Sequence, residues 1–196
     1  MSRAGVVVPI RSFVDAKLRL AERLSESGRA DLVRDCAMRV VEAASPLPVV
    51  IVTSAPEVRS WAVEVGADLV DDPGGGLNAA SAAGRDHLRS LGFVRCVVAH
   101  ADLPRARALA PLAEDGDRPI VTLVPCHRAD GTNVCSIPIA LPFQFAYGEG
   151  SFRRHAAEAR RVRAALRVVR RADLAFDVDV PDDLDRLTSS DLPVHV

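Results

Sequence analysis

The chain is organised around the stretch Val97-Val98-Ala99-His100-Ala101-Asp102-Leu103-Pro104, near the middle of its 196 residues. The β-branched, apolar residues from 94 to 99 predict a buried strand. Asp102 follows this strand, and Pro104 stops the strand pairing and can open a helix. Ligands of open α/β sheets bind beyond the carboxyl ends of strands, so an acid placed there suits a metal ion that holds phosphates. The alternative is that Asp102 only caps a helix that begins after Pro104.

The composition is that of one globular domain spanning residues 1–196. The chain has 25 Lys and Arg against 26 Asp and Glu, so no overall charge favours nucleic acid or a membrane surface. Its start lacks the pattern of a signal peptide, and no apolar run approaches the roughly 18 residues of a membrane span. The four cysteines have no paired metal-binding spacing. Cys36 and Cys96 lie in apolar helix and strand patterns, which predicts buried thiols in a reducing cytoplasm.

Strand and helix patterns alternate along the chain. The predicted strands cover residues 5–10, 48–53, 68–71, 94–99, 119–124, 132–139 and 166–169. The predicted helices cover about residues 25–43, 55–66 and 78–91. Two further helices are predicted, one that Ser151 would cap and a closing one that begins at Pro181. Strands that alternate with helices predict an α/β fold, with a mostly parallel sheet and helices on both faces.

A basic loop follows the first predicted strand. Three cations, Arg11, Lys17 and Arg19, lie within residues 11–20. Phosphate-binding loops often occupy this position, but the loop lacks both the G-x-G-x-x-G pattern and the G-K-[ST] of a P-loop. Binding of phosphate here would therefore depend on the three side-chain charges, and the alternative is a solvated basic loop.

Two glycine-containing loops precede predicted helices. Gly74-Gly75-Gly76 allows a close approach of the backbone to a ligand, and Asn78 follows at the start of a helix. Gly148-Glu149-Gly150-Ser151 leads into a second helix, whose start suits a phosphate or carboxylate. For both loops the alternative is that Asn78 and Ser151 act only as helix caps.

Two further carboxylates lie in Phe176-Asp177-Val178-Asp179-Val180-Pro181. Period-two spacing would put Asp177 and Asp179 on one side of a short strand. Two like charges side by side cost stability unless a cation or base lies between them. This arrangement favours a cation site, and the alternative is a pair of surface acids beside the cap of the closing helix.

These signals together predict one site at the carboxyl edge of the sheet. Its members are Lys17, the glycine loop 74–76, the carboxylates of Asp102, Asp177 and Asp179, and a second anion pocket at 148–151. Two anion sites around a divalent cation suggest the transfer of a nucleotidyl group between phosphates.

The same residues resemble the motifs of a known family, the 2-phospho-L-lactate / phosphoenolpyruvate guanylyltransferases of deazaflavin coenzyme F-420 biosynthesis. The matching segments, in the order of the family, are Pro9-Ile10-Arg11-Ser12-Phe13, Ala16-Lys17-Leu18-Arg19-Leu20, Leu77-Asn78, Asp102-Leu103-Pro104, Asp130-Gly131-Thr132-Asn133, Tyr147-Gly148-Glu149-Gly150-Ser151-Phe152 and Asp177-Val178-Asp179-Val180-Pro181. The resemblance covers residues 6 to about 187, and Arg11 departs from the lysine that is usual there.

The resemblance implies a GT-A-like, Rossmann-like nucleotidyltransferase fold and a role for each matching residue. Asp102, Asp177 and Asp179 would coordinate Mg²⁺, and Lys17 and Asp102 would be catalytic. The implied nucleotide-binding residues are Pro9, Arg11, Lys17, Arg19, Gly76 and Asn78, and the implied substrate-binding residues are Thr132, Gly148 and Ser151. His100 is interpreted as a strand-end histidine and not as a base.

The reaction implied by the resemblance is guanylyl transfer. The phosphate of phosphoenolpyruvate or 2-phospho-L-lactate would attack GTP, and pyrophosphate would leave. The expected partners are GTP and a small phosphorylated three-carbon acid, in the cytoplasm, without nucleic acid or membrane, and homodimer formation is left open. The alternatives are a paralogue using CTP or another phosphorylated or phosphonate acid, a GT-A glycosyltransferase with Asp177-Val178-Asp179 as its D-x-D motif, and a nucleotide-binding module without activity.

Overall fold

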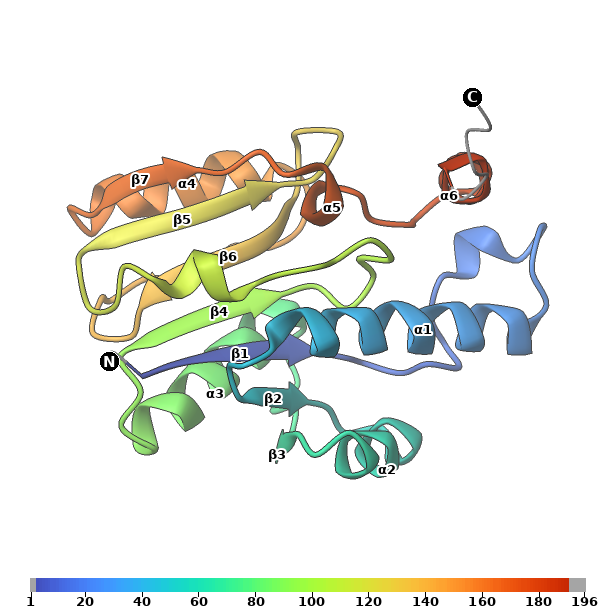
Figure 1. The fold of residues 1–196 in the computed structure, drawn as a ribbon, viewed down its shortest axis with the longest axis horizontal. Coiled ribbons are helices and arrows are strands. Elements are labelled where there is room, and N and C mark those ends of the chain that lie inside the picture. Colours follow the sequence, from blue (N-terminus) through green and yellow to red (C-terminus); the bar gives the residue numbers. More distant parts are fainter. Residues whose placement is uncertain (1–2, 191–196) are drawn as a thin grey trace.

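The computed structural model describes residues 3–190, with side chains described as far as Leu187. The strands form one seven-stranded sheet in the order β3-β2-β1-β4-β6-β5-β7 (Figure 1). They are β1 (Ala4–Pro9), β2 (Val49–Val52), β3 (Asp68–Val70), β4 (Arg95–Ala99), β5 (Ile120–Pro125), β6 (Thr132–Pro138) and β7 (Ala165–Val168). β6 runs antiparallel to both of its neighbours, and the other paired strands are parallel. The predicted mostly parallel sheet is confirmed.

Helices cover both faces of this sheet (Figure 1). They are α1 (Glu26–Ala44), α2 (Pro56–Glu64), α3 (Leu77–Ser90), α4 (Ser151–Arg161), α5 (Ala172–Ala175) and α6 (Pro181–Ser190), with 3₁₀ turns η1 (Leu18–Leu20) and η2 (Ala110–Ala113). Because successive strand residues face opposite sides, Val6 and Val8 of β1 pack with α1 and α2, whereas Val7 packs with α3 and α4. The predicted α/β fold is therefore confirmed in its layers as well as in its strands.

The reversal of β6 follows from a short hairpin connection. Residues 126–131 join β5 to β6 and contain the predicted turn at Asp130-Gly131, and a connection this short cannot cross over to make a parallel pair. Ala99 at the end of β4 pairs with Val134 near the start of β6. Thr132 and Asn133 therefore lie at the edge where β4 ends.

The segments that follow Asp102 and precede α6 differ from the predictions. Residues 103–109 are irregular, so Asp102 does not cap a helix after Pro104. Residues 176–179 are also irregular, because the N–H of Val178 donates to Asp102 O at 3.3 Å instead of to a neighbouring strand. The short strand predicted for these residues is wrong.

The helix caps predicted at Asn78 and Ser151 are wrong. The residue before α3 is Gly76 and the residue before α4 is Gly150, so neither Asn78 nor Ser151 acts as a cap. Both glycines have positive φ, a conformation that side chains disfavour. Ser25 does cap α1, because its Oγ accepts the N–H of Gly28 at 3.1 Å.

The four cysteines are free and buried, which confirms the prediction made for Cys36 and Cys96. Among residues 3–190, no helix has the length and apolarity that are needed to cross a bilayer.

Gly84 allows α3 to pack closely on β1 and β2. A Cβ at this position would lie 2.3 Å from Val7 Cγ1 and 3.0 Å from Val52 Cγ2. We expect Gly84→Ala to lower the free energy of unfolding by about 1–3 kcal/mol, because overpacking displaces buried valines. Urea denaturation measures this loss. The control is Gly28→Ala in α1, where the closest contact of the new Cβ is a single atom, Ser25 Oγ, at 3.3 Å. An equal loss in both variants would contradict the packing argument.

Candidate active site

A lysine bridges two carboxylates at the carboxyl edge of the sheet. Lys17 Nζ donates to Asp102 Oδ2 and to Asp179 Oδ1, the second bond measuring 2.5 Å. The backbone of Lys17 has φ 54°, in the left-handed region, immediately before η1. A non-glycine residue keeps such a conformation only where its surroundings hold it, and such residues gather at functional sites.

The sheet explains how residues distant in the sequence meet here. β1 and β4 are parallel neighbours, so the segments after them, which carry Lys17 and Asp102, leave the sheet at the same edge (Figure 1). The segment after α5 is held to this edge by Asn133, whose Nδ2 donates to Leu174 O at 3.1 Å and to Ala175 O at 3.0 Å. This attachment brings Asp179 to the other two side chains.

Electrostatic effects couple the predicted carboxylates. Burial alone would lower the pKa of Lys17, but the charges of Asp102 and Asp179 outweigh burial and raise it. Burial also opposes ionisation of Asp102, yet the charges of Lys17 and His100 bring its pKa below the usual value. The pKa of Asp177 is raised, first by burial and then by the charges of Asp102 and Asp179. The charges of Asp102 and Asp179 therefore oppose ionisation of Asp177.

The donor atoms of this cluster fit Mg²⁺ in their chemistry. Asp102 Oδ1 is buried without a hydrogen-bond partner among the described residues, a cost that a cation would relieve. Carboxylate oxygens are the hard ligands that Mg²⁺ prefers. In the described part of the chain, no three His, Cys, Asp or Glu side chains already form a metal-binding group. Lys17 lies between Asp102 and Asp179, and Asp177 Oδ1 faces His127 Nδ1 at 3.2 Å.

The residues predicted to bind the nucleotide lie at the end of β1, in the segments after β1 and β3, and in the first turn of α3. Pro9 ends β1, and the glycines at 74–76 have φ of 78°, 86° and 79°, so this loop adopts a backbone that other residues rarely reach. Arg11 and Arg19 are exposed. Asn78 lies in the first turn of α3. The glycine loop and Asn78 thus follow β3, and the two arginines follow β1.

The residues predicted to bind the acid, Thr132, Gly148 and Ser151, lie together. Ser151 Oγ accepts the N–H of Thr132 at 3.0 Å, and the N–H of Ser151 donates to Gly148 O at 3.0 Å. Gly148 has φ 109°, which a side chain would strain. The hydroxyl of Ser151 therefore joins the start of β6 to α4 instead of capping the helix.

A buried histidine that the sequence analysis did not single out connects these groups. His155 Nε2 accepts the N–H of Ala146 at 2.9 Å, so Nδ1 carries the hydrogen and donates to Thr132 Oγ1 at 3.0 Å. The next N–H, that of Tyr147, donates to Asn78 Oδ1 at 2.6 Å. The network thus links the predicted nucleotide side to the predicted acid side. The signal in the sequence was the i, i+4 spacing of Ser151 and His155 on one helix face.

The neutral state of His155 predicts sensitivity to acid. Burial, together with the charges of His100 and Arg154, lowers the pKa of His155 from 6.5 to about 4, although Glu158 acts in the opposite direction. The unfolded chain binds this proton below about pH 6.5, and the folded chain binds it only near pH 4. The stability contributed by the neutral ring is therefore complete above pH 6.5 and is lost as the pH falls toward 4.

We expect this group to contribute a loss of about 3 kcal/mol in the free energy of unfolding across that window. Urea denaturation of the wild type and of His155→Gln at a series of pH values isolates the contribution, since other titrating groups are common to both proteins. A pH dependence that is the same in the two proteins would contradict the assignment.

Two buried polar atoms near this network lack a partner among the described residues: His100 Nε2 and the hydroxyl of Tyr147. The two rings lie with their centroids 5.2 Å apart, and only 7% of Tyr147 is exposed. A buried polar atom without a hydrogen bond reduces the stability of the fold by about 1–3 kcal/mol. Such atoms indicate places where a ligand can supply the missing hydrogen bond. The sequence analysis assigned His100 no function and quoted Tyr147 only as part of a motif.

Asp183 holds the segment that carries Asp179. Its Oδ2 accepts the N–H of Asp179 at 2.9 Å and of Val180 at 3.0 Å, and its two oxygens accept from Arg128 Nη2 at 2.7 and 2.8 Å. Asp183 is fully buried. Pro181 begins α6, so an acid two residues later can reach back to the N–H before the helix, as in a capping box. This spacing was the signal in the sequence for the role of Asp183.

Solved structures place the fold among the nucleotidyltransferases. A nucleotidyl transferase from Methanothermobacter thermautotroptrophicus aligns with a TM-score of 0.65 at 18% identity, covering 97% of this chain and 98% of that one. A 4-diphosphocytidyl-2C-methyl-D-erythritol synthase also aligns with a TM-score of 0.65, at 12% identity, covering 95% and 97%. At such low identity these likenesses show the fold alone, which this chain shares with both nucleotidyltransferases.

Comparison of the sequence with known families and proteins identifies the family to which the chain belongs. The family model described as guanylyl transferase CofC like matches residues 4–189. The phosphoenolpyruvate guanylyltransferase of Rubrobacter xylanophilus is 38% identical over 192 residues, covering 94% of this chain and 93% of that protein. The one from Sphaerobacter thermophilus is 37% identical over 191 residues, covering 92% and 90%. The chain belongs to the family of CofC-like guanylyl transferases, which confirms the resemblance seen in its motifs.

Proposed function

We propose that the protein transfers GMP from GTP to the phosphate of phosphoenolpyruvate, releasing pyrophosphate, as a step of coenzyme F-420 biosynthesis in the cytoplasm. The observation that supports this most directly is the contact of Lys17 with Asp102 and Asp179, in a chain 38% identical to a phosphoenolpyruvate guanylyltransferase. 2-Phospho-L-lactate is the second acid that the same chemistry could accept, because it also carries a phosphate and a carboxylate on three carbons.

The proposed reaction needs no general base. A phosphate oxygen of the acid is already an anionic nucleophile, and it attacks the α-phosphorus of GTP in line. The bond from the α-phosphorus to the oxygen that bridges to the β-phosphate breaks, and the electron pair leaves with pyrophosphate. The contribution of the protein is to position two anions and to neutralise their charges.

Under this proposal, Lys17 would neutralise charge on the triphosphate. In the structure its ammonium binds Asp102 and Asp179, so a phosphate that reaches this edge meets a lysine already held in position. Bound by Asp102, Asp177 and Asp179, Mg²⁺ would supply charge neutralisation and orientation of the phosphates. The nucleotide would bind beside the glycine loop at 74–76, with Arg11 and Arg19 near its outer phosphates.

The acid would bind on the other side of Asp102, against Thr132, Gly148 and Ser151. Its oxygens could complete the hydrogen bonding of His100 Nε2 and of the Tyr147 hydroxyl, which have no partner among the described residues. Since a carboxylate and a phosphate both accept hydrogen bonds, the hydroxyl of Tyr147 would donate to the acid.

Tyr147→Phe tests this contact by the removal of one oxygen atom. We expect the KM for phosphoenolpyruvate to rise about tenfold, with little change in the KM for GTP, because only the acid would lose a hydrogen bond. Steady-state kinetics with each substrate varied in turn measure both constants. A proportional rise in the two KM values, or no change in either, would contradict the assignment.

Pyrophosphate release is the direct test of the proposed function. The four ribonucleoside triphosphates are each combined with phosphoenolpyruvate, 2-phospho-L-lactate or 3-phosphoglycerate, with Mg²⁺ or with EDTA. We expect the highest rate with GTP and phosphoenolpyruvate, and no release with EDTA. A preference for CTP or for another acid would favour a paralogue. No pyrophosphate release in any combination would favour a glycosyltransferase or a nucleotide-binding module without activity.

A further inference from the structure

A histidine on the hairpin between β5 and β6 contacts two acids of the segment that follows α5. His127 Nδ1 lies 3.2 Å from Asp177 Oδ1, and an ionised carboxylate only accepts, so Nδ1 is the donor of this hydrogen bond. His127 Nε2 lies 3.5 Å from Asp183 Oδ1, but it has no hydrogen-bond partner among the described residues. The hydrogen bond of the ring is therefore made to Asp177, one of the carboxylates assigned to Mg²⁺.

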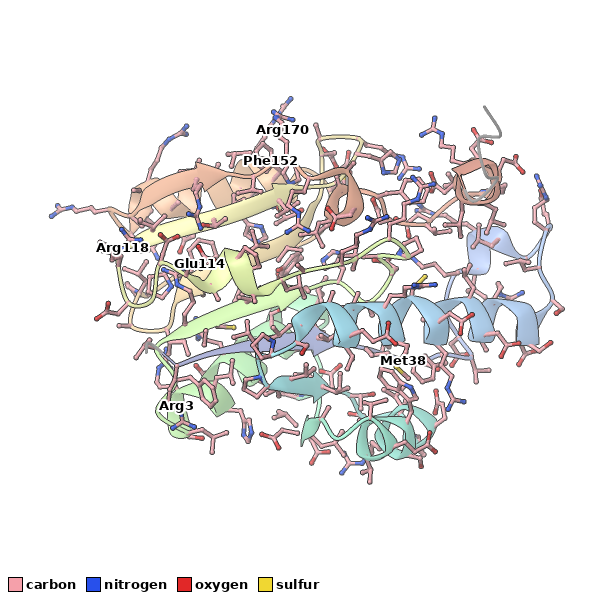
Figure 2. The ribbon with its side chains drawn as sticks, in the orientation of Figure 1. Arg3, Met38, Glu114, Arg118, Phe152 and Arg170 are labelled. Atoms are coloured by element: carbon pink, nitrogen blue, oxygen red, sulfur yellow. The ribbon has the colours of Figure 1, made fainter. Side chains whose placement is uncertain are left out.

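The hairpin holds this histidine in place. The N–H of His127 donates to Ala175 O at 2.7 Å, so the hairpin lies against the end of α5 (Figure 1). The N–H of Phe152, which is labelled in Figure 2, donates to Asp130 O at 3.0 Å and attaches the far side of the hairpin to the start of α4. The rings of His127 and Phe176 lie with their centroids 5.4 Å apart. These contacts leave the imidazole little freedom to turn away from its partner carboxylate.

One oxygen of Asp177 is hydrogen-bonded, and the other can bind a cation. Oδ1 accepts from His127 and also from Asn133 Nδ2 at 3.4 Å. Oδ2 lies 4.0 Å from Arg128 Nη1, which is too far for a hydrogen bond. Donors on Oδ1 fix the rotation of the carboxyl group, and hydrogen bonds of this kind orient the carboxylates that bind metal ions.

We infer that His127 is a positioning residue, which orients the carboxylate of Asp177 so that Oδ2 binds the divalent cation. This inference rests on the proposed function, in which Asp177 is a ligand of Mg²⁺. Asn133 cannot replace His127 in this role, because its Nδ2 also donates to Leu174 O at 3.1 Å and to Ala175 O at 3.0 Å. Loss of a residue that orients a metal ligand typically weakens metal binding about 10- to 100-fold.

Two amide variants that differ by one methylene group test the position of the donor. The amide nitrogen of His127→Asn can lie where Nδ1 lies, whereas that of His127→Gln reaches the place of Nε2, on the side of Asp183. We expect full-length His127→Gln to bind Mn²⁺ about tenfold more weakly than the wild type, and His127→Asn to recover most of the affinity. Mn²⁺ accepts the same oxygen ligands as Mg²⁺, and the EPR signal of the free ion measures its binding without substrates.

The matched control is His87→Gln. It makes the same replacement at a histidine of α3 that faces another acid, with Nε2 3.8 Å from Asp68 Oδ2. Because neither residue belongs to the carboxylate cluster, this variant should bind Mn²⁺ like the wild type.

The dependence of pyrophosphate release on Mg²⁺ provides a second measurement. A positioning role predicts that His127→Gln needs about tenfold more Mg²⁺ for its half-maximal rate and approaches the wild-type kcat when Mg²⁺ is saturating. A purely structural role would lower kcat at every concentration of Mg²⁺.

Equal Mn²⁺ affinity in the wild type and His127→Gln, or an equal loss in His127→Gln and His127→Asn, would overturn the inference. Absence of Mn²⁺ binding by the wild type would overturn it together with the metal assignment. If the wild type releases pyrophosphate but its Mn²⁺ affinity does not depend on His127, only the inference fails. If Mn²⁺ binding depends on His127 in a protein that releases no pyrophosphate, the inference is supported and the proposed guanylyl transfer fails.

Discussion

Replacement of Asp102 by asparagine is expected to lower the rate of pyrophosphate release about a thousandfold while the protein stays folded. The amide preserves the shape of the side chain but removes the negative charge that holds Lys17 and the oxygen that would face Mg²⁺. Because the reaction would depend on positioned charges, the loss should be in kcat at saturating GTP, phosphoenolpyruvate and Mg²⁺.

The fold should survive Asp102→Asn, because Lys17 Nζ keeps its bond to Asp179 Oδ1 when the charge of Asp102 is removed. The charge of Asp102 contributes to the raised pKa of Asp177, and its loss should bring that pKa closer to the usual value. Asp185→Asn, an exposed acid of α6 that pairs with Arg23, is the matched control and should keep the wild-type rate. An undiminished rate in folded Asp102→Asn would refute the catalytic and metal assignments together.

Asp183→Ala is expected to reduce the free energy of unfolding by about 4 kcal/mol, because it leaves Arg128 and two backbone N–H groups without their acceptor. Urea denaturation measures the loss. The variant should also lose activity, since the N–H of Asp179 is one of the two groups that Asp183 holds. The carboxylate that binds Lys17 would then no longer be fixed in place.

A double-mutant cycle separates the ion pair from the backbone contacts. Arg128→Met alone breaks the pair but leaves Asp183 bonded to the N–H groups of Asp179 and Val180. Asp183→Ala in that background should therefore still destabilise the protein and still lower activity. If Asp183→Ala has no effect once Arg128 is replaced, Asp183 acts only through the ion pair and does not position Asp179.

Much of the site could be predicted because its geometry depends on the edge of the sheet and not on the order of the strands. Lys17 and Asp102 both follow apolar runs typical of parallel strands, and the carboxyl ends of such strands always share one edge. The sequence could not show that the N–H groups near Asp179 bond to Asp102 O and Asp183 Oδ2. Those tertiary contacts replace the strand pairing that period-two spacing suggested.

The predicted caps of α3 and α4 are wrong because both side chains bind elsewhere in the fold. Asn and Ser are good caps in isolation, but in this fold Asn78 accepts from Tyr147 and Ser151 accepts from Thr132, both far away in the sequence. The glycines before each helix adopt positive φ and begin it without a side-chain cap. The buried atoms of His100 and Tyr147 could not be found from pattern, because a missing hydrogen-bond partner is a property of the folded chain.

The reversed direction of β6 has a consequence for how such proteins could diversify. It places the start of the second hairpin strand, and α4 after it, opposite the loops that follow β1 and β3. Under the proposed function, the donor and the acceptor of the nucleotidyl group would each occupy one half of a shared rim. Substitutions confined to the hairpin and α4 could then allow a new acceptor acid to bind without a change in nucleotide binding.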